Sequence, residues 1–323
     1  MTVRSEILVE RLVDLTTPEQ TTVAALAAEL TSGLTDDPSW VASARNRANH
    51  LPAGLRAAVR DFRYDPGPFG WMLVHGLPLH PEQLPDTPTV PGSVERHPTA
   101  PAAILAMVTS LLGELTAYRP EKTGALVQNV VPVRGQERSQ SNAGSTDLTM
   151  HVENAFHHHR PDYVALLCLR NDHDDVAGLR LASIRRAAPL LDERTRRTLS
   201  EPEFITEPPP SFQAEGLPPV RHAVLSGDPE DPDVLIDFAA TRALSVAGER
   251  AMQELDAAFD AVTDTVVLRP GDLAVVDNRV TMHGRTSFRP RFDGRDRWLQ
   301  RAFILLNFRR AGASRIGGGH VLA

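Results

Sequence analysis

The feature that most constrains the fold is a long succession of short apolar runs, which begins at about residue 124 and continues to about residue 310. Typical runs are DYVALLCLR, GLRLASIRR, DTVVLRPGDLAVVDN and RWLQRAFILLNFRR, and turn signals such as PPPS, GDPEDPD and PGD lie among them. Many short strands with regular turns are typical of a β-sandwich or a β-barrel. We therefore expect a mainly β fold.

Helical patterns flank and interrupt this strand-rich part. Residues 17–33 start with Thr-Pro-Glu and stop at a glycine, which is typical of a helix with an N-cap and a defined end. Residues 38–63 indicate a second helical stretch, interrupted near Pro52, and residues 102–116 indicate a third. An amphipathic helix is predicted at about 245–261, within the strand-rich part.

These patterns predict one domain that spans residues 1–323. Residues 1–120 form a helical N-terminal part packed on a barrel, and residues 121–310 form the barrel core, with the helix at about 245–261 inserted in it. Residues 311–323 (GASRIGGGHVLA and the alanine before it) are expected to be a loose tail.

Composition excludes several classes of protein. The net charge is −7, and we find no basic patch or stripe of the kind that marks a nucleic-acid-binding domain. No apolar run of about 18 residues predicts a membrane span, and residues 1–15 lack the apolar core of a secretory signal. Cys168 is the single cysteine, which excludes an intrachain disulfide and fits a reducing compartment. We expect a cytoplasmic enzyme.

One triplet, His151-Val152-Glu153, has the spacing of two metal ligands on a strand. Side chains two residues apart in an extended strand point to the same side, so His151 and Glu153 share a face. His283 is the best candidate for a third ligand among the 12 histidines. Two histidines and one carboxylate form the facial triad of non-haem Fe(II) oxygenases, which leaves coordination positions open. An His-x-Glu triplet often arises by chance, so this pattern needs support from other residues.

Other candidate residues have plainer interpretations. His157–His159 precede Arg-Pro and are expected in a partly exposed loop, not at a metal. His173 and His222 lie in polar turns and have no predicted role. Cys168 lies in an apolar strand and is expected to be a small buried hydrophobe, not a nucleophile.

Two arginines follow His283 at Arg297 and Arg301, four residues apart in a predicted strand, with Leu299 between them on the same face. Two guanidinium groups that point into a barrel are costly unless each meets a carboxylate. Bidentate pairing with a carboxylate supplies that partner. Together with the triad, the pair predicts one arginine for the distal carboxylate of 2-oxoglutarate and one for a carboxylate of the substrate.

With these residues in view, the chain resembles the clavaminate synthase-like 2-oxoglutarate/Fe(II) oxygenases. The resemblance is carried by EKTGALVQNVVPV, HVENAFHHHRPDYVALLCLRND and GDLAVVDNRVTMHGRTSFRPRFDGRDRWLQRAF, and it covers nearly the whole chain. Within the family, the chain is most similar to the hydroxylases that act on free amino acids at C3. The resemblance implies a distorted jelly-roll, or double-stranded β-helix, with flanking helices.

The resemblance also implies the roles of four site residues. His151, Glu153 and His283 are implied ligands of Fe(II), and Arg297 is implied to bind the distal carboxylate of 2-oxoglutarate. Molecular oxygen is the second co-substrate. Glu153 argues against the related halogenases, which leave the carboxylate position empty for chloride.

The substrate residues come from the same resemblance. Arg301 is implied to hold the α-carboxylate and Glu121 the α-amino group, while Asn142 and Asp237 are implied to reach the substrate. Residues 129–149 match a mobile segment that closes over it. The physical chemistry agrees, because Glu121 and Arg301 complement a zwitterion.

The substrate and the outcome of the reaction remain open at this stage. Asp237 accepts hydrogen bonds from an amide or a cationic group and repels a carboxylate, so L-asparagine is favoured over aspartate and glutamate. L-Lysine, L-arginine and L-citrulline stay as alternatives, as do desaturation and oxidative cyclisation. Outside the class, the alternatives are a zinc hydrolase and a cupin-like binding protein that has lost turnover. A role in antibiotic biosynthesis rests on analogy alone.

Overall fold

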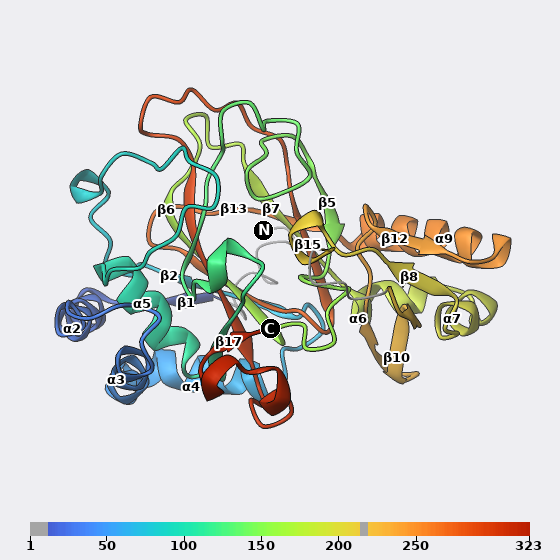
Figure 1. The fold of residues 1–323 in the computed structure, drawn as a ribbon, viewed down its shortest axis with the longest axis horizontal. Helices are drawn as coiled ribbons and strands as arrows, with labels where there is room; N and C mark the ends of the chain where they lie inside the picture. The colour runs from blue at the N-terminus through green and yellow to red at the C-terminus, as the bar shows by residue number, and fades with distance from the viewer. Residues whose placement is uncertain (1–11, 214–218) are drawn as a thin grey trace, which may run out of the picture.

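A computed structural model describes residues 12–213 and 219–323, so the expectation about a secretory signal falls largely outside the described residues. The protein has four layers: helices, a large sheet, a small sheet and a second group of helices (Figure 1). The large sheet has eight strands in the order β1-β2-β14-β6-β16-β3-β17, with β4 paired to β16. Its strands are β1 (Leu12–Asp14), β2 (Trp71–His75), β3 (Glu114–Tyr118), β4 (Gln128–Val130), β6 (Tyr163–Arg170), β14 (Leu273–Asp277), β16 (Trp298–Leu305) and β17 (Val321–Leu322).

The small sheet faces the large one and has the order β13-β7-β15-β5. Its strands are β5 (Leu148–His151), β7 (Gly178–Ser183), β13 (Asp264–Val267) and β15 (Thr281–Arg285). Short strands form a three-stranded sheet and a hairpin beside it: β8 (Phe204–Thr206), β9 (Arg221–His222) and β12 (Thr241–Ala243), and β10 (Leu225–Asp228) with β11 (Asp231–Val234).

Helices cover the outer faces of both sheets. On the large sheet lie α2 (Thr17–Ala28), α3 (Pro38–Ala48), α4 (Ala53–Tyr64) and α5 (Ala100–Thr109). Near the small sheet lie α6 (Ile184–Ala187), α7 (Glu193–Leu199) and α9 (Val246–Val262), and α8 (Pro210–Gln213) is a single turn. Two helices begin at the capping residues that the sequence contains. Thr16 and Glu19 form a capping box at the start of α2, and the Ser245 side chain accepts a hydrogen bond from the Gly248 amide at the start of α9. Within the described residues, no helix is long and apolar enough to span a membrane.

Alternation along the strands assigns each side chain to a layer. On β6, Ala165 and Leu167 pack toward the helices, whereas Leu166 and Cys168 pack into the space between the sheets. On β15, Met282 packs toward α9 and its neighbours, which turns His283 to the opposite face. The space between the sheets is therefore lined by alternate residues of both sheets.

Three predictions about the elements were wrong in detail. The predicted helix 102–116 ends at Thr109, and Glu114–Tyr118 is a strand because it pairs with β16. The predicted loose tail is ordered, since Val321 and Leu322 pair in parallel with Ala117 and Tyr118. The strand predicted for GLRLASIRR ends at Ser183, and the Ser183 side chain caps the helix α6 that follows. Whether the chain is a single domain stays a prediction.

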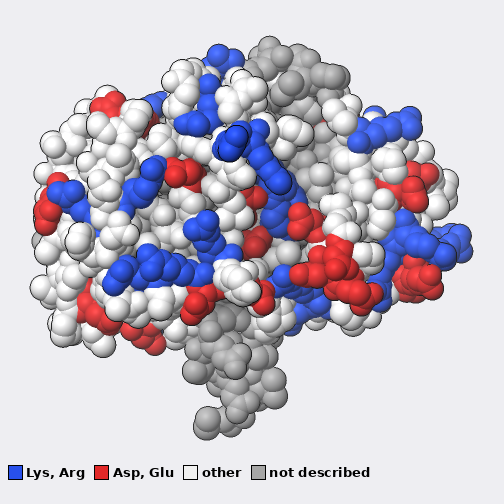
Figure 2. Space-filling view, turned by 90° about the horizontal axis from the view of Figure 1, so that it is seen from below, with Lys and Arg blue, Asp and Glu red and all other residues white. Residues whose placement is uncertain are grey.

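Charged side chains of both signs are interspersed on the surface. On the face in Figure 2, Lys and Arg lie among Asp and Glu, and the positive charges do not form one continuous stripe on the described residues of that face. The expectation that the protein has no nucleic-acid partner remains a prediction.

Candidate active site

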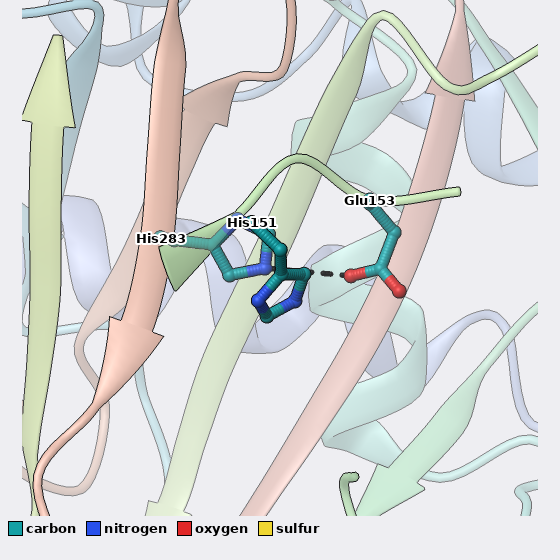
Figure 3. Close-up of side chains that lie close together, drawn as sticks. All are labelled: His151, Glu153 and His283. Carbon is teal, nitrogen blue, oxygen red and sulfur yellow. Dashed lines mark ion pairs between the residues drawn. The ribbon is translucent and has the colours of Figure 1, made fainter. Parts of the chain in front are cut away.

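The two predicted histidines and the glutamate meet between the sheets. His151 is the last residue of β5, Glu153 follows in the adjoining turn, and His283 lies in β15 directly opposite His151 (Figure 3). One potential ligand atom from each residue lies within 4.8 Å of the others. His283 Nε2 is 3.4 Å from Glu153 Oε2, and the two imidazole centroids are 4.5 Å apart. We call these three residues the His–Glu–His group.

A hydrogen bond orients His151, whereas the Nδ1 of His283 is buried without a partner among the described residues. His151 Nδ1 lies 2.8 Å from the Thr149 carbonyl, which can only accept, so Nδ1 donates and Nε2 is the nitrogen left to bind a metal. Glu153 Oε2 is buried and receives no hydrogen bond in the described structure. A free imidazole nitrogen beside an unsatisfied carboxylate oxygen is a donor set that fits a divalent metal ion.

Asn278 holds the backbone of Glu153, a role that the sequence did not predict. Asn278 Oδ1 accepts from the Glu153 amide at 2.7 Å, and Nδ2 donates to the carbonyls of Glu153 at 3.0 Å and Pro161 at 2.9 Å. Asn154, the next residue, has φ +51°, which is uncommon outside glycine. Asn278 therefore keeps the carboxylate in place where the strand has already ended.

Asn278→Ala is expected to weaken metal binding by about 10–100-fold, the effect typical of losing a residue that positions a ligand. The measurement is a chelator-competition titration with Mn(II). Asn171→Ala is the control, because that side chain donates to Asp175 at the surface and should leave metal binding unchanged. Equal metal affinity in Asn278→Ala and the wild type would contradict the role of Asn278.

Arg301 lies at the centre of a buried charge network. Its Nη1 donates to Glu153 Oε1 at 2.7 Å, and its Nη2 donates to Glu121 and Gln128. With its amide oxygen turned toward the guanidinium, Asn142 accepts from Nη1 at 2.9 Å and from Nη2 at 3.1 Å. Glu121, Asn142 and Arg301, predicted from separate parts of the chain, are thus brought together.

This network sets the ionisation of the group. Burial raises the pKa of the Glu153 carboxyl, but Arg301 first, and then His283 and His151, hold the pKa well below its usual range. Burial lowers the pKa of His283, with a further contribution from His151. An ionised Glu153 carboxylate beside a neutral His283 imidazole is the protonation state that metal binding requires.

Two cavities meet at the His–Glu–His group. The outer cavity has a volume of about 640 Å³, and its lining includes Glu121, Asn142, His151, Glu153 and Asp237. Asp237 is half-buried and forms a β-bridge with His151. Several residues of the segment 129–149 form one wall of this cavity. That the segment closes over a substrate stays a prediction.

The inner cavity is narrow, about 30 Å³, and lies beyond the group, where Arg297, Arg285 and Leu299 line it. Arg297 is buried, and its Nε has no hydrogen-bond partner in the described structure. Burial lowers the pKa of the Arg297 guanidinium. A buried guanidinium without a carboxylate needs an anionic partner, and the described residues form no ion pair with Arg297. Arg285 lies beside it and was not singled out from the sequence, although it is two residues from His283.

The remaining candidates lie outside these cavities. Cys168 is fully buried, and burial raises the pKa of its thiol to about 12, which agrees with an inert hydrophobe. His173 lies with Asp293 and Asp296 in a second group of potential ligands, but the Asp296 carboxylate already accepts two backbone amides. His222 bonds to Thr206. His158 is exposed as expected, whereas His157 is buried against Tyr118 and Phe212.

His157 is expected to make the fold acid-sensitive. Burial lowers its pKa from 6.5 to about 4, so the unfolded chain binds a proton in this range that the folded chain does not. The stability that His157 contributes is therefore complete above pH 6.5 and declines as the pH falls to 4, by up to about 3 kcal/mol. Urea unfolding at pH 7.5 and 5.0 measures the loss. His157→Gln should reduce the difference between the two pH values, while His158→Gln at the exposed neighbour should keep it; equal differences in all three proteins would contradict the assignment.

Comparison with known proteins decides the class. Residues 97–303 match the family described as taurine catabolism dioxygenase TauD, TfdA family. The chain belongs to this dioxygenase family. It is 53% identical over 291 residues to L-asparagine oxygenase of Streptomyces coelicolor (strain ATCC BAA-471 / A3(2) / M145), which covers 90% of this chain and 87% of the relative. It is 36% identical to clavaminate synthase 2 of Streptomyces clavuligerus, over 89% of this chain and 90% of the relative.

The similarity to a solved structure covers nearly the whole chain. The structure of asparagine oxygenase in complex with Fe(II), 2S,3S-3-hydroxyasparagine and succinate superposes with a TM-score of 0.94 at 50% identity, covering 97% of this chain and 99% of that one. The predicted fold class, a mainly β clavaminate synthase-like fold with flanking helices, is thereby confirmed. The enzyme is an oxygenase, and a zinc hydrolase is no longer a useful alternative.

Proposed function

We propose that this dioxygenase uses Fe(II), 2-oxoglutarate and O2 to hydroxylate a free L-amino acid at C3, with L-asparagine as the substrate and succinate and CO2 as co-products. The observation that carries the proposal is the His–Glu–His group placed between an unpaired buried Arg297 on one side and the Arg301–Glu121 pair on the other. The likeness to asparagine oxygenase supports the choice of substrate.

His151, Glu153 and His283 would hold the metal, and Arg297 would bind the distal carboxylate of 2-oxoglutarate. Bound there, the iron and its co-substrate supply the oxidising power for cleavage of a C–H bond. The work of the chain is to orient the substrate and to exclude water. Val130, Leu166 and Leu179 supply apolar parts of the wall of the inner cavity.

Arg301 and Glu121 would bind the zwitterionic end of the amino acid, Arg301 the α-carboxylate and Glu121 the α-ammonium. In the structure each neutralises the other, so a zwitterion can replace their mutual contact without leaving a buried charge unpaired. Asn142 bonds to Arg301 and lines the same cavity, which places it beside the bound substrate. Asp237 would accept a hydrogen bond from a side-chain amide and disfavour a carboxylate.

The test is succinate release by the purified apoprotein supplied with Fe(II), 2-oxoglutarate and O2, across a panel of free L-amino acids, with mass analysis of each product. A one-oxygen mass gain on asparagine alone supports the full proposal. Turnover of lysine, arginine or citrulline keeps the chemistry and overturns the substrate, and loss of two hydrogens indicates desaturation. Stoichiometric iron without any succinate would favour a binding protein that has lost turnover.

The location and partners form the last part of the proposal. The single cysteine is buried and fits a reducing compartment, which supports a cytoplasmic enzyme. The proposed partner is the free amino acid alone, with no nucleic acid and no membrane.

A further inference from the structure

The inner cavity carries more positive charge than one distal carboxylate-binding arginine explains. Arg285, Arg297 and Arg301 line it, and Glu153 is the single carboxylate among its lining residues. Glu153 is already paired with Arg301 at 2.7 Å. Arg285 and Arg297 therefore remain as two buried cations with no ion pair in the described part of the chain.

Arg285 is held beside Arg297 by the sheet. It is two residues from His283 on β15, so the two side chains share the face between the sheets. The guanidinium carbons of Arg285 and Arg297 lie 5.2 Å and 5.8 Å from the centroid of the same Phe288 ring. Two positive charges beside the same buried ring repel each other, which is unfavourable unless an anion binds to both.

The hydrogen bonds of Arg285 leave it able to bind such an anion. Its Nη2 donates to the carbonyl of Thr146 at 2.8 Å, and its Nε is buried without a partner. Arg297 Nε is likewise buried without a partner. Each guanidinium thus has a buried Nε donor without a partner, and both arginines line the cavity that ends at the His–Glu–His group.

We propose that Arg285 is a second co-substrate-binding residue, which shares with Arg297 the recognition of the distal carboxylate of a 2-oxo diacid. The inference rests on the proposed function, because it assumes that the other end of the acid is bound at the His–Glu–His group. The inner cavity is about 30 Å³, the space of roughly one water, so binding of a carboxylate there requires the arginine side chains to rotate. The two arginines together then favour a dicarboxylate over a 2-oxo monoacid of similar shape.

The alternative role for Arg285 is structural. Its bond to Thr146 lies beside two others, from the Ser287 amide to Asp147 and from the Phe288 amide to Ser145, so this part of the chain is tied to β15 without Arg285. A structural role predicts that loss of Arg285 weakens every 2-oxo acid equally. A recognition role predicts a selective loss for the diacid.

The experiment measures binding of 2-oxoglutarate and of 2-oxobutyrate, which lacks the distal carboxylate, to Mn(II)-loaded protein by calorimetry under nitrogen. The readout is the preference, defined as the ratio of the two dissociation constants. Arg285→Gln is expected to reduce the preference by about tenfold or more, as the loss of one buried charged partner implies. An unchanged preference in Arg285→Gln overturns the proposal, whatever happens to the stability of that variant.

Two further variants make the result specific. Arg170 is also buried, and it donates to backbone carbonyls away from the cavity, so Arg170→Gln should keep the wild-type preference. An equal loss of preference in Arg170→Gln overturns the proposal. Arg297→Gln should retain part of the preference, and complete loss there would make Arg297 the only partner, even if Arg285→Gln cannot be folded. If wild-type protein binds neither acid, the proposed function itself fails.

Discussion

Arg301→Leu is expected to lose both amino-acid binding and folding stability. The side chain is 3% exposed and pairs with Glu121 and with Glu153, which are 16% and 10% exposed. Its removal leaves two carboxylates without their cation, a change that costs about 3–5 kcal/mol for a buried pair. Urea unfolding of the metal-free protein measures the loss, and the KM for the amino acid should rise with it.

The pH dependence of this loss provides a check. Arg301 lowers the pKa of Glu153, so its contribution is present at neutral pH and is lost as the pH falls through the carboxylate range. The stability gap between wild type and Arg301→Leu should therefore narrow in acid. Arg279→Leu is the control, because its pair with Asp162 is partly exposed and contributes about 0–1 kcal/mol. A neutral-pH gap no larger than that of the control would show that the buried network does not stabilise the fold.

Glu153→Ala is expected to abolish turnover, with a loss of at least about 10³-fold, or about 4 kcal/mol in the barrier. The physical reason is that the carboxylate supplies the only negative charge of the His–Glu–His group, and its Oε2 is the unsatisfied atom that faces His283. The measurements are iron content after anaerobic loading and the rate of succinate formation.

His173→Ala is the matched control for that experiment. His173 belongs to the other group of potential ligands, with Asp293 and Asp296, and lies outside both cavities. It should bind iron and form succinate as the wild type does. If His173→Ala lost iron and Glu153→Ala kept it, the metal site would have to be moved to the second group.

That the three residues of the His–Glu–His group lie close together could be predicted in part from sequence, because a two-residue spacing pointed to two of them. The two-residue repeat of an extended chain predicted a shared face for His151 and Glu153, although β5 ends at His151 and Asn278 holds Glu153 in the turn that follows. The same repeat predicted a shared face for Arg297 and Arg301, although β16 begins at Trp298, one residue after Arg297. That His283 lies opposite His151 is a matter of strand register, which the spacing did not determine. The sequence made His283 the best candidate among 12 histidines, and the resemblance to known oxygenases then implied it as a metal ligand.

The residues that escaped prediction act through contacts between distant parts of the chain. Asn278 bonds to Glu153 across 125 residues, and Gln128 bonds to Arg301 across 173 residues. An asparagine in a Val-Val-Asp-Asn turn carries no local signal for such a role. Arg285 could have been predicted, because it lies two residues after His283, the same spacing that linked Glu153 to His151. The end of helix α5 was misjudged because Glu114–Tyr118 is apolar enough to continue the helix and becomes a strand only by pairing with β16.

Strands supply several residues of the metal and co-substrate site, whereas loops supply much of the outer cavity, and this difference has a consequence for engineering the enzyme. His151, His283 and Arg301 lie on strands, whereas the part of the outer cavity that would meet the substrate side chain comes from irregular segments such as 140–143, 207–209 and 237–240. Loops tolerate replacement better than packed strands do. Combinatorial libraries confined to those three segments should therefore yield variants with new amino-acid preferences that still load metal and consume co-substrate like the parent.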